Sequence, residues 1–160
     1  MAMTIKTDGL EELGAMMAKL GEKANEVAGK SLYEGADVVG DAFTKAISSI
    51  KTEPIGNSKR KMRLPSPEEK AALEGKSGIA KFRNTGDGVD TMIGISGAAG
   101  YASVNGKPKA VRLIARAINS GTSFMKKQPV FRKAVNSSKA AAQAKIADKA
   151  EELFNEIIGG

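Results

Sequence analysis

Apolar residues recur at the three-and-four spacing of a helix in two long segments, one toward each end of the chain. In the first segment these positions are Leu10, Leu13, Met17, Leu20, Ala24 and Val27, followed after a slip of one residue by Leu32, Ala36, Val39, Phe43, Ala46 and Ile50. A narrow stripe of this kind is typical of a helix that packs on other helices. The pattern predicts an N-terminal helical segment over residues 5–53.

Local signals mark both ends of this first helix. Asp8 and Glu11 have the spacing of a capping box, so the helix should begin at about Gly9. Pro54 should end it, because the residue before a proline disfavours helical geometry. An unbroken helix of this length would span roughly 60 Å. A compact domain of this size cannot cover so long a stripe by itself, so something else must bury part of it.

Glycines complicate this first helix. They occur at Gly14, Gly21, Gly29, Gly35 and Gly40. Each costs about 1 kcal/mol relative to alanine inside a helix. Two interpretations remain open: the helix breaks between Gly29 and Gly35, or the glycines allow a neighbouring helix to approach closely. We favour a break or kink.

The second long segment predicts a C-terminal helix over residues 129–158. Its apolar or small positions on one side are Phe131, Val135, Ser138, Ala142, Ile146, Ala150, Leu153 and Ile157. A shorter amphipathic helix is predicted over residues 107–121, because Pro108 suits a first helical position and Gly121 suits a C-terminal cap. The polar and basic loop between these two helices should be exposed.

Shorter elements are predicted between the helices. Residues 54–75 should form a basic linker and a short helix, with Ser66 as its N-cap and Pro67 at its first position. Residues 76–106 should form a hairpin followed by a mobile loop, since two strand-like arms flank the turn residues Thr85–Gly88. A lone hairpin is marginal in water, so it should lie on the helices or join strands of neighbouring subunits.

Together these elements predict an α+β fold in a single domain, residues 1–160, with long helices at both ends around a small antiparallel hairpin and a short third helix. Only 4% of the residues are aromatic and none is Trp, so the core should be thin and partner chains should help to complete it. The chain has no Cys and no His, which removes disulfides, zinc sites of the usual kind, thiol catalysis and imidazole chemistry. We therefore expect a protein that is not an enzyme and needs no cofactor or metal.

The 25 basic and 18 acidic residues give a net charge of +7, which suits nucleic acid or an acidic protein face but is also ordinary for solvated helices. Candidates for a basic lumen or DNA-facing surface are Lys59, Arg60, Lys61, Arg63, Lys126 and Lys127. No aromatic residue is interleaved among them to stack bases, so sequence-specific binding is disfavoured. No apolar run approaches the roughly 20 residues of a membrane span, and no secretory signal opens the chain. We expect a protein kept in the cytoplasm or in a particle assembled there.

Three segments, in the same order, resemble one family. They are Ile5–Leu13, the strand-like pair Gly78–Asn84 and Met92–Gly97, and the helix–loop–helix segment Ile114–Ala134. This layout is similar to the tail-component family of long-tailed bacteriophages, also called neck or tail-completion proteins (minor tail protein Z-like). The chain departs from the family pattern at Asn119, where an acid is usual, in the order Val130-Phe131, and at Lys133, where a proline is usual.

The resemblance implies a structural virion protein of the phage neck, a tail-completion or head-tail joining component assembled in the host cytoplasm. It would form a ring, expected to be a hexamer, whose bore passes DNA, and would contact the head-closure protein and the tail terminator or tail tube. Head-to-tail contacts between identical subunits would bury the excess apolar stripe.

A docking surface is expected on the loop before the last helix, with Phe124, Met125, Val130 and Phe131 as candidates. The competing interpretation is that these residues fasten the last helix to the first. The alternative function is a non-enzymatic DNA-binding protein that uses the basic linker and the basic side of the short helix, which carries Lys107, Lys109, Arg112 and Arg116.

Overall fold

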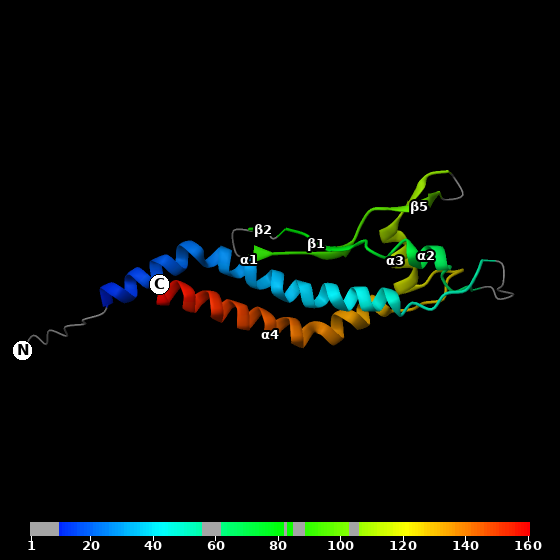
Figure 1. Ribbon diagram of the computed structural model, residues 1–160. Helices are drawn as coiled ribbons and strands as arrows, with labels where there is room; N and C mark the ends of the chain where they lie inside the picture. The colour runs from blue at the N-terminus through cyan, green and yellow to red at the C-terminus, as the bar shows by residue number, and fades with distance from the viewer. Residues whose placement is uncertain (1–9, 56–61, 82, 85–88, 103–105) are drawn as a thin grey trace, which may run out of the picture.

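The structure, a computed structural model, describes residues 10–55, 62–81, 83–84, 89–102 and 106–160. The fold is α+β, as predicted. Two long helices, α1 (Leu10–Ser48) and α4 (Val130–Gly159), pack side by side in opposite directions, so the start of α1 lies beside the end of α4 (Figure 1). Small antiparallel sheets and two short helices make up the rest of the regular structure in these described ranges.

Helix α1 is continuous, so the predicted break between Gly29 and Gly35 is wrong. Gly35 is instead a point of close contact with α4. A Cβ atom built on Gly35 would lie 2.6 Å from Ile146 Cδ1 and 3.0 Å from the carbonyl oxygen of Ala142. The second interpretation of the glycines, close approach of a neighbouring helix, therefore holds at this position. The helix ends at Ser48, a few residues before the predicted end. The predicted cap at Asp8 lies outside the described residues.

The predicted stripe on α4 faces α1. Phe131, Ser138 and Ala142 are buried, whereas Ile146, Leu153 and Ile157 toward the far end are half-buried. Val135 is an exception because it is 42% exposed, and its neighbour Ala134 is buried in its place. The ring of Phe131 packs edge-to-face on Phe43 of α1, with ring centroids 5.4 Å apart.

The short helices follow their local signals. Helix α2 (Pro67–Ala71) begins with a complete capping box: the hydroxyl of Ser66 accepts from the Glu69 backbone N–H, and the Glu69 carboxylate accepts from the Ser66 backbone N–H. Helix α3 (Val111–Ser120) ends at Gly121, whose φ of 78° suits glycine. The predicted start of α3 at Pro108 is wrong, since Pro108–Ala110 form strand β6.

The predicted hairpin is present and lies against α1. Strand β1 (Ser77–Ile79) pairs with β4 (Ile93–Ile95), and β2 (Arg83–Asn84) pairs with β3 (Val89–Asp90), both antiparallel. The phenol of Tyr33 on α1 donates a hydrogen bond of 3.0 Å to the Ala80 carbonyl. The expectation that the hairpin lies on the helices is confirmed, while its turn lies outside the described residues.

A second hairpin replaces the loop expected after β4. Strand β5 (Ala98–Ala102) pairs antiparallel with β6, with Ala98 opposite Ala110 and Ala102 opposite Pro108. Glycine and alanine do not favour a strand by themselves. Residues 98–102 form one because they pair with β6, which lies several residues further along the chain.

The core is concentrated at one end of the molecule. The side chains that are almost completely buried there are Ile47, Ile50, Leu73, Val111, Ile114, Ile118 and Met125. They come from the end of α1, the short helices and the loop before α4. The rest of the α1–α4 pair extends away from this end as an elongated arm (Figure 1).

Candidate interaction surface

Two loops that are basic in the sequence meet at the core end of the molecule. The backbone N–H of Arg63 donates to the Phe124 carbonyl, and the N–H of Lys126 donates to the Arg63 carbonyl, each over 2.8 Å. This parallel bridge joins the linker that follows α1 to the loop that precedes α4. Positions that are far apart in the sequence therefore lie on one surface.

The side chain of Gln128 fixes the same loop to the end of α1. Its amide oxygen accepts from the Lys51 N–H and its amide nitrogen donates to the Lys51 carbonyl, both over 2.9 Å. The Gln128 N–H donates to the Ile118 carbonyl of α3 over 2.7 Å. The expected exposed loop is thus hydrogen-bonded to the linker, to the end of α1 and to α3, which limits its freedom to adapt to a partner.

The Arg63 side chain forms an ion pair with Glu69, six residues further along the chain. Its guanidinium donates to both carboxylate oxygens of Glu69, over 2.6 and 2.8 Å, and also to the Leu64 carbonyl over 3.0 Å. The Lys109 ammonium lies 3.9 Å from the same carboxylate. Burial by itself raises the pKa of Glu69, but the hydrogen bonds from Arg63 and Ser66 and the nearby charges outweigh it, so the pKa lies below its ordinary value.

The basic candidates therefore divide into three groups. Lys59, Arg60 and Lys61 lie outside the described residues. Arg63 neutralises a buried carboxylate, which makes it a structural residue rather than a free cation. Lys126 and Lys127 are exposed beside the bridge to Arg63 and carry charge that faces solvent.

The expected docking residues are also divided. Phe124 is 53% exposed at the tip of the loop, and Val130 is half-buried. Met125 and Phe131 were expected on an exposed docking surface, and this expectation is wrong, because their side chains are only 1% and 8% exposed. Met125 fills the core and Phe131 packs on Phe43, which agrees with the competing interpretation that these residues fasten the last helix to the first.

The structure contains a groove that the sequence pattern did not predict. It has a volume of about 330 Å³ and lies between α3, β4, α1 and the start of α4. Apolar side chains of Phe43, Ile95 and Phe131 line it, together with Arg112 and Arg116 from α3. We call it the basic groove. In the described part of the chain, neither guanidinium forms an ion pair.

The basic groove lies in a part of the chain without acidic residues. From Thr91 to Ala147 the sequence contains ten Lys or Arg and no Asp or Glu. A basic side on the short helix α3 was expected from the sequence, and the wider asymmetry in charge agrees with it. The apolar lining could not have been foreseen, because Phe43, Ile95 and Phe131 come from three different elements.

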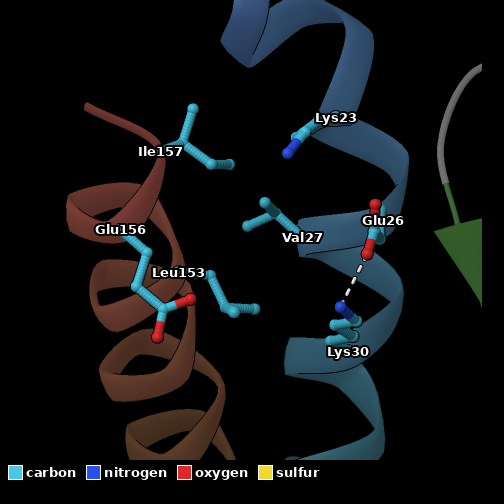
Figure 2. Close-up of a pocket in the computed structure, with 7 residues that line it drawn as sticks. All are labelled: Lys23, Glu26, Val27, Lys30, Leu153, Glu156 and Ile157. Carbon is cyan, nitrogen blue, oxygen red and sulfur yellow. Dashed lines mark hydrogen bonds and ion pairs between the residues drawn. The ribbon is translucent and has the colours of Figure 1, made fainter. Parts of the chain in front are cut away.

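A second hollow lies between the far ends of α1 and α4. Its volume is about 80 Å³, and Figure 2 shows Val27 of α1 pointing toward Leu153 of α4. Lys30 and Glu26 form an ion pair of 2.6 Å at its edge. The lower pKa of Glu26 follows from this hydrogen bond with Lys30 and from the Lys30 charge. Apolar contacts flanked by an ion pair are usual between packed helices. The residues that line this hollow do not indicate a catalytic or ligand-binding site.

Among the helices in the described ranges, none contains an uncharged apolar stretch of the length that a membrane span needs. The described residues also contain no group of three or more acidic side chains placed to hold a metal ion.

Comparison with known proteins gives no match: no family model fits the chain, and neither a curated protein nor a solved structure matches it significantly.

Proposed function

We propose that the protein is a structural component of the neck or tail-completion region of a long-tailed bacteriophage, where copies of it form a ring that passes DNA. The resemblance of three sequence segments, in the family's order, supports this function. The observation that carries it is the elongated pair of long helices, together with large apolar side chains that stay exposed on loops, α3 and α4.

The arrangement of the two long helices supports assembly, because α1 and α4 pack on each other as an elongated pair. A pair of long helices covers only one side of each helix and leaves the rest to solvent or to a partner.

Large apolar side chains are exposed along the whole molecule. They are Ile55, Met62, Met92, Leu113, Phe124, Val135 and Phe154, each 38% to 69% exposed. Single exposed apolar residues are normal on a monomer. In this protein the exposed apolar side chains lie on loops, on α3 and toward both ends of α4, as expected for a subunit that has several neighbours.

The mass of the purified protein, alone and mixed with tail proteins, tests the proposal. We expect the protein to form a closed homo-oligomer, either alone or in the mixture with tail proteins. We also expect it to co-sediment with purified phage particles. A protein that remains monomeric in both conditions and never accompanies particles would contradict the proposed function.

A second candidate function is non-specific DNA binding, favoured by the ten basic residues without an acid between Thr91 and Ala147. A DNA-binding protein should retard duplex DNA, with an affinity that falls steeply as salt increases because phosphate contacts release counterions. A neck component should leave free duplex DNA unretarded at moderate salt. Electrophoretic mobility at several salt concentrations distinguishes the two.

A further inference from the structure

We propose that the basic groove receives the C-terminal end of α4 from a second copy of this chain. This inference rests on the proposed self-assembly and identifies the two surfaces that meet. They differ from each other, so the contact is head-to-tail and can close into a ring.

The groove has two features that a partner must match. Phe131 is buried, and half-buried Phe43 and Ile95 line the groove beside it, so it favours an apolar side chain. Arg112 and Arg116 stand one helical turn apart at its edge and are exposed, so they favour carboxylates. A partner with both properties is an acidic helix that also carries an apolar face.

The end of α4 has these properties. Ala147, Glu151, Phe154 and Ile158 recur at spacings of four, three and four, which places them on one face of the helix. Phe154 is 38% exposed, and Glu151 is exposed. This face differs from the one that packs on α1, which carries Leu153 and Ile157.

Charge distinguishes the two chain segments that carry these surfaces, and Lys19, Lys23 and Lys30 of α1 lie beside the end of α4 on the side that faces α1. From Asp148 to Gly160 the chain contains four acidic residues and one basic residue. The preceding stretch, which includes the groove arginines, contains no acid. Opposite charge on two separate surfaces steers association and fixes which surface meets which.

One chain cannot make this contact within itself. Phe131 in the groove and Phe154 lie on the same continuous helix, and the residues between them span roughly 35 Å at the usual rise of a helix. The groove and the end of α4 can meet only between copies. A nucleic acid fits less well, because a phosphate backbone needs cations and gains nothing from the apolar lining.

Engineered cysteines test the contact directly, because the natural chain contains none. We would place one cysteine beside the groove, Ser120→Cys, and another beside Phe154 in a separate protein, Asn155→Cys. Both positions are exposed. Oxidation of the mixture should produce a disulfide dimer that joins the two variants. Gln143→Cys, an exposed position in the middle of α4, is the matched control and should not cross-link to Ser120→Cys.

Charge reversal provides an independent measurement. Arg116→Glu and Glu151→Arg should each weaken self-association on the order of tenfold, and the two together should restore it, because the pair of charges is reversed. Circular dichroism would verify that each variant is folded. Lys139→Glu, exposed elsewhere on α4, controls for the general change in charge.

The outcomes separate this inference from the proposed function. An oligomer that joins particles but gives no disulfide between Ser120→Cys and Asn155→Cys would overturn the inference and leave the function standing. Loss of DNA retardation in Arg116→Glu with unchanged self-association would assign the groove to DNA and overturn it as well. A protein that stays monomeric at all concentrations and accompanies no particle would contradict both.

Discussion

Two residues show how a single position can be decided by a distant neighbour. Gly35 lies in the middle of α1, where its sequence context indicates a weak helix, yet it is a position at which α4 comes into close contact. Glu69 lies in the first turn of α2 and takes part in its capping box, yet it also pairs with Arg63 from the preceding linker. At Gly35 the local signal favoured a break that does not occur, whereas at Glu69 the local signal was correct but incomplete.

Filling the contact at Gly35 should destabilise the protein. We expect Gly35→Leu to lower the free energy of unfolding by about 1–3 kcal/mol, because the added side chain meets Ile146 and the backbone of Ala142. The control is Gly21→Ala, where a Cβ would meet nothing within 4 Å. That change should raise stability by up to about 1 kcal/mol. Urea unfolding of both variants measures the difference, and equal effects would contradict the close contact.

Removing the charge of Glu69 should cost stability in a pH-dependent way. We expect Glu69→Gln to lose about 1.5–3 kcal/mol at neutral pH, since charged hydrogen bonds to Arg63 are lost. The folded-state pKa of Glu69 lies below its ordinary value of 4.5. The stabilisation is therefore complete above the unfolded-state pKa and disappears as the pH falls through the folded-state pKa.

The measurement is urea unfolding of wild type and Glu69→Gln at a series of pH values from neutral to acid. The difference between them should shrink at the acid end. Exposed Glu68, on the same turn of α2, provides the control Glu68→Gln, which should have little effect at any pH. A difference that is constant with pH would show that the carboxylate charge is not what stabilises this contact.

At the scale of elements, the buried aromatic and aliphatic contacts that join α1 to the start of α4 lie at the core end. There Phe43 and Phe131 meet edge-to-face, and Ile47 and Ile50 enter the same core as α3 and Met125. Gln128 adds hydrogen bonds between the loop and the end of α1. The loop before α4 is consequently a joint between elements, with Phe124 as its exposed tip.

The two phenylalanines of this region should behave oppositely. We expect Phe131→Ala to lower the free energy of unfolding by about 3–5 kcal/mol, because it removes a buried ring. Phe124→Ala should change it by less than about 0.5 kcal/mol, because the ring is 53% exposed. Thermal and urea unfolding measure both. If Phe124 contacts a neighbouring subunit, its replacement should weaken assembly while stability is unchanged.

At the scale of the whole molecule, stability should fall from the core end toward the end of the helical arm. Buried side chains gather around α3, whereas the segments of α1 and α4 near Lys23 and Glu156 bury little and are lined by charged side chains. Regions with few buried apolar contacts open locally at low free energy.

Hydrogen exchange should report this gradient. We expect the slowest amide exchange in residues 111–118 and 42–47, and faster exchange in residues 20–28 and 150–158. Assembly should slow exchange in residues 150–158, because the end of α4 would then be covered by a neighbour. Uniform protection of the free protein along α1 and α4 would contradict the gradient.

Features that depend on neighbours in the sequence were predictable. The stripe along α4, the capping box of Ser66, the glycine after α3 and the first hairpin all follow from spacing and turn chemistry over a few residues. These signals were sufficient for the α+β fold, although the end of α1 and the start of α3 shifted by a few residues. The resemblance to phage neck proteins rests on the same kind of local pattern, and it remains a proposal.

The sequence by itself thus determined which segments are helical, where several of them stop, and that charge is unevenly distributed. The tertiary structure alone decided that Gly35 is a contact, that Met125 and Phe131 are buried, and that Pro108 joins a strand. It also decided that Arg63 is paired and that the basic groove exists. The physical reason is that periodicity and caps are local, whereas burial, ion pairing and strand partnership depend on residues that only folding brings together.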